Sequence, residues 1–365
     1  MRATAAVVPA KNSPFELREV VLDDPRPDEV VVRVVASGIC HTDLIVRDQW
    51  YPPELPAVLG HEGSGVVEQV GADVTSVRPG DRVALSFNFC RTCRNCLRGR
   101  PAYCEDFFPR NFGGRRSDGS ATVRASDGSA LNANFFGQSS FGTYALASEH
   151  TIVKVPEDVP LELAGPLGCG IQTGAGAVLN SLAPPDGSSI VVFGAGTVGL
   201  SAIMGADVAN CGTIIAVDLV PERLRLATEL GATHVLDGRD DALSERITGL
   251  TGGGADYTVE TTANPRVLRT AVDSLNFGGT CGVIGAAPIG TEVSLDMSAL
   301  LFDRSVRGIV EGDSVPRLFI PRLIDLYRRG RFPFDRLIRT YPFEEINAAA
   351  ADSERGVTVK PVITM

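Results

Sequence analysis

The sequence is poor in lysine and in unbroken apolar runs, and each shortage excludes a class of partner or protein. Only three of the 365 residues are lysine, and acidic side chains outnumber basic ones by 44 to 34. A net charge of −10 disfavours nucleic acid and anionic membranes as partners, because both would repel the chain. Two long uncharged stretches, 163–185 and 187–206, are broken by glycines and prolines, so we expect buried core there and no membrane span.

A secretory signal is also lacking. The first twenty residues contain no basic segment followed by an apolar core, so we expect a cytoplasmic protein. Low-complexity tracts are missing as well, and 44% of the residues are apolar, which is enough to fill cores. The length predicts two or three domains of an ordinary globular protein.

The pattern of apolar and turn residues changes near residue 170. Before it, β-branched runs separated by turn residues predict irregular antiparallel β structure. From about residue 188, six apolar strands alternate with helical segments, which predicts a doubly wound parallel sheet. An Arg-rich helix after residue 312 and a short β-like tail follow, and we expect the tail to return to the first domain. The predicted domains are therefore 1–170 with 312–365, and 171–311.

A dinucleotide site is predicted at residues 194–199, which read GAGTVG between a strand and a helix. Gly194 permits a tight turn, Gly196 lets the backbone approach a pyrophosphate, and Gly199 allows close packing of helix and strand. Asp218 ends the next strand and is placed to bind the adenosine ribose, which favours NAD over NADP. Arg223 follows five residues later and could soften that preference. The alternative is a glycine-rich turn that only packs.

Four cysteines lie close together in the segment FCRTCRNCLRGRPAYC. Four thiolates from one loop close a tetrahedron around Zn²⁺ and leave no open position, so we predict a structural zinc. Two local disulfides or unrelated free cysteines are the alternatives. The predicted ligands are Cys90, Cys93, Cys96 and Cys104.

Three further segments carry metal-ligand residues: GICHTD at 38–43, GHEGSG at 60–65 and GCGIQTG at 168–174. Each alone is weak, since a lone buried Cys or His is usually a core residue. Together with the cysteine segment and GAGTVG, in this order, they resemble the zinc-dependent alcohol dehydrogenases of the medium-chain dehydrogenase/reductase superfamily. The segments at 114–120, 135–145 and 311–338 resemble the aryl (benzyl) alcohol dehydrogenase branch.

The resemblance implies an α/β protein in which a GroES-like β-rich catalytic domain accompanies a Rossmann domain, with zinc and nicotinamide in a cleft between them. It assigns Cys40, His61 and Cys169 to a catalytic Zn²⁺ with an open fourth position. Such a zinc lowers the pKa of a bound alcohol, so that hydride can pass from a zinc-bound alkoxide. Glu62 matches a carboxylate that visits the metal, and Asp43 matches the group that orients His61. The alternative for both acids is ordinary surface charge.

A proton relay is implied at Thr42, whose hydroxyl would accept the substrate proton. Many family members end this relay with a His three residues later, but here that position is Ile45. We hypothesise that His41 replaces it as the terminal base. A contact to the coenzyme phosphate is the alternative role for His41.

The resemblance also implies residues that contact the coenzyme and the substrate. Val198 and Thr173 would lie at the nicotinamide and Lys360 at the pyrophosphate, although a lone basic residue in a tail is usually solvated. Aromatic and apolar side chains would line the substrate pocket and suit a benzylic or allylic alcohol, with core packing as the rival account. The pocket residues are Trp50, Phe135, Phe136, Ile284 and Val310.

The predicted function is an NAD-dependent alcohol dehydrogenase with two zinc ions that oxidises primary aromatic or allylic alcohols reversibly to aldehydes. An aliphatic alcohol or S-(hydroxymethyl)glutathione dehydrogenase of the same superfamily is one alternative, and a catalytically silent NAD-binding protein is another. A zinc-lobe interaction module is disfavoured because the lobe is a small part of the chain. We expect a homodimer or homotetramer, with the edge strand near 305–311 continuing the sheet across a two-fold axis. The loop at 113–134 could rim the cleft, pack on a neighbour or be solvated surface.

Overall fold

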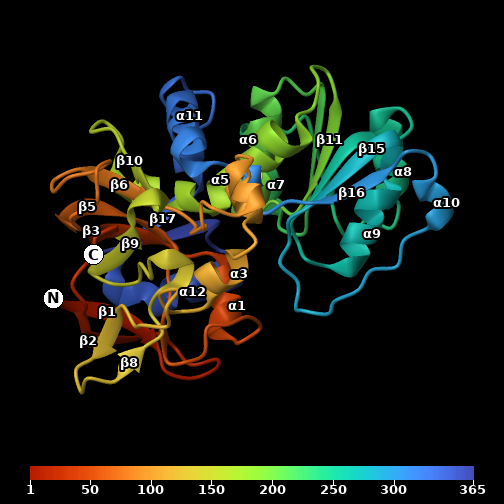
Figure 1. The fold of residues 1–365 in the computed structure, drawn as a ribbon. Helices are drawn as coiled ribbons and strands as arrows, with labels where there is room; N and C mark the ends of the chain where they lie inside the picture. The colour runs from red at the N-terminus through yellow and green to blue at the C-terminus, as the bar shows by residue number, and fades with distance from the viewer. The chain divides into compact units, whose positions relative to one another are not determined.

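The computed structural model describes all 365 residues and divides them into two units (Figure 1). Unit 1 comprises Met1–Cys169, Val315–Ile324 and Asp335–Met365. Unit 2 comprises Gly170–Ser314 and Asp325–Phe334. The chain returns from unit 2 to unit 1 between residues 314 and 315, a few residues after the predicted boundary at 311/312. Residues 325–334, which include the end of a helix, are grouped with unit 2.

The first sheet of unit 1 has five strands in the order β4-β1-β2-β7-β8. Strand β1 pairs antiparallel with β2 and β4, and β7 forms a hairpin with β8. The predicted loop at 113–134 is therefore partly regular structure, since its hairpin extends this sheet. The strands are β1 (Arg2–Val8), β2 (Glu16–Leu22), β4 (Ala57–Val58), β7 (Val123–Ala125) and β8 (Ala130–Leu131).

The second sheet of unit 1 follows the order β10-β6-β5-β3-β18-β17, with β9 also paired to β3. Its long central strand β3 reads EVVVRVVASG, and such β-branched runs favour a strand buried on both faces. The C-terminal β18 pairs antiparallel with β3, which confirms that the tail returns to the first domain. The strands are β3 (Glu29–Gly38), β5 (Glu62–Val70), β6 (Arg82–Leu85), β9 (Tyr144–Ser148), β10 (Ile152–Lys154), β17 (Ile338–Pro342) and β18 (Lys360–Thr364).

Short helices connect these strands and close the core of unit 1. Its aromatic core contains Phe87, Phe135 and Phe141, which are all fully buried. Helix α12 adds Ile346, Ala349 and Ala350 to the same core. The helices are α1 (His41–Arg47), α2 (Arg94–Leu97), α3 (Phe107–Phe112), α4 (Leu161–Ala164), α11 (Pro316–Arg328, shared with unit 2) and α12 (Ile346–Glu354).

Unit 2 is a six-stranded sheet in the order β13-β12-β11-β14-β15-β16, and every pairing is parallel. This confirms the predicted doubly wound sheet, and each of the six predicted strands is present. The strands are β11 (Ser189–Phe193), β12 (Thr213–Asp218), β13 (His234–Asp237), β14 (Ala255–Glu260), β15 (Leu275–Val283) and β16 (Ser305–Gly308).

Helices cover both faces of this sheet. Val191 and Phe193 of β11 pack with side chains of α8 and α9 on one face, whereas Val192 points toward Gly199 of α6 on the other. Alternation of this kind follows from the two-residue repeat of a strand. None of the helices of the protein is both long and apolar enough to cross a membrane. The helices of unit 2 are α5 (Gly170–Gly176), α6 (Thr197–Val208), α7 (Pro221–Glu229), α8 (Leu243–Thr251), α9 (Pro265–Asp273) and α10 (Met297–Leu300).

Candidate active site

Four predicted site residues converge in unit 1. The ligand atoms of Cys40, His61, Glu62 and Cys169 all lie within 4.8 Å of one another. Cys40 is the N-cap of α1, His61 and Glu62 stand at the start of β5, and Cys169 follows a short 3₁₀ helix. Gly60 makes the turn before His61 at φ +88°, where a side chain would also collide with Phe141. Segments far apart in the sequence thus form one cluster.

Asp43 joins two of these candidate ligands. Its Oδ1 lies 2.9 Å from His61 Nδ1 and accepts a hydrogen bond from the backbone N–H of Gly60, while Oδ2 accepts from the N–H of Cys40. Both side chains are fully buried. Because Asp43 bonds Nδ1, the His61 ring presents Nε2 to the cluster. Asp43 therefore lies where a group that orients His61 is expected.

The cluster fits a metal cation. His61 Nε2 is buried and has no hydrogen-bond partner, which is costly for a polar atom unless a ligand completes it. Burial alone would lower the pKa of His61, but the charge and hydrogen bond of Asp43 raise it well above its usual value. A hydrogen bond from Cys169 and the nearby Lys360 ammonium lower the pKa of Cys40. The site thus favours a thiolate facing a positive charge, and two thiolates with one imidazole are a donor set that suits Zn²⁺.

Lys360 lies in an environment that the sequence did not predict. The structure buries its side chain, and the ammonium donates to Glu62 Oε1 at 2.9 Å, to Glu62 Oε2 at 2.8 Å and to the carbonyl of Ile39. Its three N–H donors therefore all bond to groups of unit 1. Burial raises the pKa of Glu62, and although burial alone would lower that of Lys360, the Glu62 charge raises it.

Phe135 and Phe136 pack beside the candidate ligand His61. They are 0% and 3% exposed, and both belong to the core of unit 1. The ring of Phe136 stacks on His61 with centroids 4.5 Å apart, and Phe135 meets the same imidazole edge-on at 5.3 Å. Both rings therefore pack against a candidate ligand, and their role as pocket walls stays a prediction.

The relay candidates lie on α1. Thr42 Oγ1 is 3.7 Å from Cys40 Sγ, which places the hydroxyl beside the ligand cluster. His41 is exposed at the first position of the helix, and Ile45 is buried in the core. Trp50 follows the helix and is 46% exposed, so it is not a core residue.

The other four candidate ligands form a separate lobe around α2. The sulfur atoms of Cys90, Cys93, Cys96 and Cys104 lie within 4.8 Å of one another, and none of the eight cysteines forms a disulfide. Backbone N–H groups of Cys93 and Thr92 outweigh burial and lower the pKa of Cys90 to about 6, whereas burial raises that of Cys104. Four thiols at this spacing fit a bound Zn²⁺, because a cation removes the repulsion among their thiolate forms.

The glycine turn in unit 2 has the geometry that a nucleotide needs. Gly194 adopts φ +94°, and a side chain on Gly199 would collide with the carbonyl oxygen of Gly194. A Cβ on Gly196 would meet no protein atom, so close packing does not explain the glycine there. Gly196 is the N-cap of α6, where free backbone N–H groups attract a phosphate.

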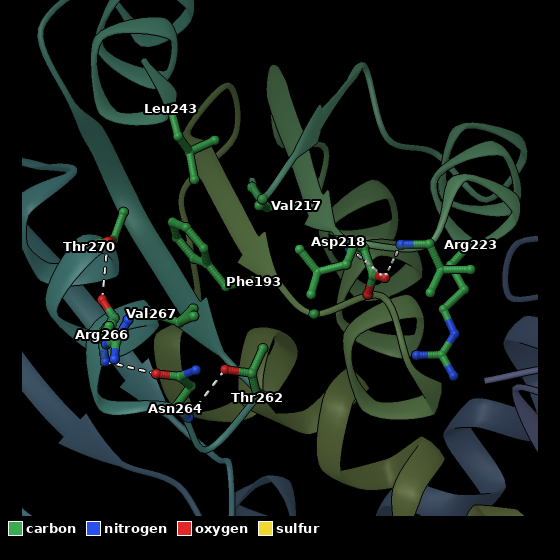
Figure 2. A pocket seen from close by; sticks show the side chains of 14 residues that line it. Phe193, Val217, Asp218, Arg223, Leu243, Thr262, Asn264, Arg266, Val267 and Thr270 are labelled. Carbon is green, nitrogen blue, oxygen red and sulfur yellow. Dashed lines mark hydrogen bonds between the residues drawn. The ribbon is translucent and has the colours of Figure 1, made fainter. Parts of the chain in front are cut away.

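A cavity of about 430 Å³ opens beside this turn (Figure 2). Asp218 Oδ2 accepts from the backbone N–H of Ala195, and Oδ1 accepts from those of Leu219 and Val220. Arg223 and Arg266 line the same cavity, and the buried Nε of Arg223 has no hydrogen-bond partner. The carboxylate of Asp218 and the guanidinium groups of Arg223 and Arg266 therefore line the same cavity.

The remaining predicted residues belong to unit 2. Thr173 is buried on α5 and Val198 lies in the first turn of α6. Ile284 follows β15, and Val310 follows β16 and is 39% exposed. None of the four lines the cavity beside Asp218.

The parallel sheet with its glycine turn and the two cysteine-containing clusters are the layout expected of a zinc-binding dehydrogenase, and family models match the chain. Residues 26–157 match the alcohol dehydrogenase GroES-like domain, and residues 197–328 match the zinc-binding dehydrogenase domain. The chain belongs to the zinc-type alcohol dehydrogenases of the medium-chain dehydrogenase/reductase superfamily. The family implies zinc and NAD(P) as cofactors.

Individual relatives are similar along their whole length. Geraniol dehydrogenase of Castellaniella defragrans is 46% identical over 99% of this chain and 97% of its own. The crystal structure of benzyl alcohol dehydrogenase from Acinetobacter calcoaceticus is 49% identical with a TM-score of 0.97, covering 100% of this chain and 99% of the other. S-(hydroxymethyl)glutathione dehydrogenase of Paracoccus denitrificans is 34% identical over the full length of both chains.

Proposed function

We propose that this alcohol dehydrogenase is a zinc- and NAD-dependent enzyme that interconverts primary allylic or aromatic alcohols and their aldehydes. The observation that supports this proposal most directly is the cluster of Cys40, His61 and Cys169, in which the buried Nε2 of His61 lacks a partner within the protein. Similarity to a geraniol dehydrogenase and to a benzyl alcohol dehydrogenase supports the substrate class, because both are named for an alcohol carbon beside a π-system.

Two zinc ions are proposed, one at this cluster and one at the four-cysteine lobe. Bound at the cluster, zinc would act as a Lewis acid for the alcohol oxygen, while bound NAD would accept the hydride. Asp43 holds the His61 ring with Nε2 facing the cluster. Glu62, paired with Lys360, places a carboxylate next to the three ligands and is proposed to approach the metal.

The substrate proton is proposed to leave through Thr42, whose hydroxyl lies beside Cys40. His41 precedes it and is exposed, so it can exchange protons with water and serve as the terminal base. Ile45 has no titratable group. A His41→Gln variant tests this step: kcat should fall while KM for NAD stays unchanged, whereas a raised KM for NAD at unchanged kcat would assign His41 to the coenzyme phosphate.

NAD is the proposed coenzyme because the carboxylate of Asp218 would repel a 2′-phosphate. The glycine turn at 194–199 and Arg223 complete this site, and Val198 and Thr173 are proposed to contact the nicotinamide. An Asp218→Ser variant should raise the NADP/NAD ratio of kcat/KM about tenfold or more, since 1.4 kcal/mol of relieved repulsion is one factor of ten. Asp237→Ser is the matched control, because Asp237 occupies the paired position on β13 but does not line the cavity.

A homo-oligomer is proposed through strand β16. It is the edge strand of the parallel sheet, and all four of its residues are exposed. Large apolar side chains that are also exposed precede it, namely Met297, Leu301 and Phe302. An unprotected edge of this kind favours pairing with a second copy. Light scattering during gel filtration should give twice or four times the chain mass, and Val306→Pro should reduce it.

Turnover assays with benzyl alcohol, geraniol and ethanol test the main proposal. We expect kcat/KM for geraniol or benzyl alcohol to exceed that for ethanol, NAD to exceed NADP, and zinc chelation to abolish activity. Activity confined to ethanol, or to formaldehyde with glutathione, would favour the alternative represented by the Paracoccus relative. A protein that retains two zinc ions but turns over none of these would be a silent NAD-binding protein.

A further inference from the structure

Gln138 bridges the backbone on the two sides of Glu62. Its Nε2 donates to the carbonyl of His61 at 2.9 Å, and its Oε1 accepts from the backbone N–H of Gly63 at 3.1 Å. The side chain is 1% exposed. One amide therefore satisfies a carbonyl and an N–H on either side of Glu62, as a neighbouring strand would.

The backbone around Gln138 is built for this contact. Phe136, Gly137 and Ser139 all have positive φ, at 52°, 65° and 48°. Two of them are not glycine, and such conformations persist only where the surroundings enforce them. Enforcement comes from several sides, since the N–H of Ser140 donates to the Gly60 carbonyl and Ser139 Oγ donates to that of Val58. The strained turn places the amide of Gln138 and the ring of Phe136 on the same ligand residue.

Gly63 completes the arrangement on the other side. A Cβ there would stand 2.5 Å from Ser140 Cβ and 3.0 Å from Gln138 Oε1, so no side chain fits between the two segments. The segment that contains Gln138 therefore packs directly on the backbone at Gly63. Because His61 Nδ1 is already held by Asp43, the ring is fixed by Asp43 and its backbone by Gln138.

We propose that Gln138 is a positioning residue for the metal at Cys40, His61 and Cys169, acting by fixing the backbone of residues 61–63. The inference rests on the proposed catalytic metal site. A buried amide that loses its partners leaves the His61 carbonyl and the Gly63 N–H unsatisfied, so the segment moves to find others. Groups that support a ligand in this way change metal affinity by about 10–100-fold when they are removed.

The four-cysteine lobe offers a matched control. Asn111 is fully buried, and its amide bonds both backbone groups of Asn88: Oδ1 accepts from the N–H at 2.8 Å and Nδ2 donates to the carbonyl at 2.9 Å. Asn88 lies two residues before Cys90 in the segment of the four-cysteine lobe. Each amide thus bonds one backbone carbonyl and one backbone N–H, beside a different set of candidate ligands.

The experiment measures zinc release from the intact holoenzyme to a colorimetric chelator, for the wild type, Gln138→Leu and Asn111→Leu. Substitution by Co²⁺ identifies each site, since a centre with four sulfur ligands and one with two sulfurs and a nitrogen differ in their absorption spectra. We expect Gln138→Leu to accelerate release from the nitrogen-containing site at least tenfold, with the four-sulfur site unchanged, and Asn111→Leu to do the reverse.

Equal acceleration at both sites, or a lowered melting temperature with wild-type release, would overturn the proposal and leave Gln138 a general structural residue. If Gln138→Leu does not fold, Gln138→Asn replaces it, because the shorter amide cannot reach both backbone groups and should give the same selectivity at smaller size. Failure of that variant to fold would also overturn the selective role. A wild type that holds two zinc ions but oxidises no alcohol would contradict the proposed function, and the zinc-release test of Gln138 would still apply.

Discussion

The two clusters of candidate metal ligands differ in how far apart their residues lie in the sequence. The four candidate ligands of the lobe all come from residues 90–104, in a partly exposed loop around the short helix α2. The candidate ligands of the other cluster come from residues 40, 61 and 169, and its imidazole is fully buried against two phenylalanine rings. A local cluster can form as soon as its metal binds, whereas a distributed one needs the β-rich unit to be folded first. Metal loss should therefore damage structure at the lobe and chemistry at the buried cluster.

The strongest test of this contrast is Cys169→Ser. We expect kcat/KM to fall by about 10³-fold or more, because a Lewis acid contributes several kcal/mol and each 1.36 kcal/mol is a factor of ten. The melting temperature should change little, and zinc content should fall by one ion per chain. Steady-state kinetics, elemental analysis and calorimetry measure the three quantities. Unchanged kcat/KM with one zinc lost would remove Cys169 from the chemistry.

The lobe should respond in the opposite sense to Cys93→Ser. Cys93 is a candidate ligand of the four-sulfur site. We expect its loss to lower the melting temperature by about 10 °C, because structural zinc contributes folding free energy directly. The kcat of the remaining folded enzyme should stay within about threefold of the wild type, since no reacting group is touched. A large loss of kcat at full stability would contradict the division of roles.

Asp43→Asn tests how far the buried cluster depends on orientation. The substitution keeps the size of the side chain but removes the charge next to His61 Nδ1. We expect a loss of about 10–100-fold in zinc affinity or in kcat/KM, as for other groups that hold a metal-bound histidine. Zinc affinity measured by competition with a chelator separates these effects, and Asp48→Asn at the C-cap of α1 is the control.

His150→Gln has the smallest expected effect and concerns a buried histidine next to the four-cysteine lobe. Burial and the nearby Arg91 and Arg110 lower the pKa of His150 to about 4, and its Nε2 lies 2.9 Å from Asn88 Oδ1. His150 therefore binds a proton below about pH 6.5 in the unfolded chain but only below about pH 4 in the folded protein. The free energy of unfolding falls as the pH falls through this window. His150→Gln should remove about 1–2 kcal/mol of that loss. Urea unfolding at pH 7 and pH 5 measures it, and an identical pH dependence in both proteins would contradict the assignment.

The same contrast explains what could be predicted. The spacing of Cys90, Cys93, Cys96 and Cys104 and the pattern GAGTVG followed by Asp218 lie in continuous sequence, so local rules were enough to identify both sites. Cys40, His61 and Cys169 became candidates only together and through the family resemblance. The pairing of Lys360 with Glu62 and the burial of Phe135 and Phe136 were not predicted, because they depend on strands β5 and β18 and on a turn that meet only in the folded unit.

The sequence by itself determined the alternation of strands and helices in unit 2, the glycine turn and the four-cysteine lobe. All three arise from neighbours along the chain, where period, turn chemistry and ligand spacing act directly. Only the tertiary structure decided that Lys360 pairs with Glu62, that His61 lies under Phe136, and that Gln138 meets the backbone of His61 and Gly63. These contacts join residues far apart in sequence, and no local pattern encodes which buried polar groups will satisfy one another.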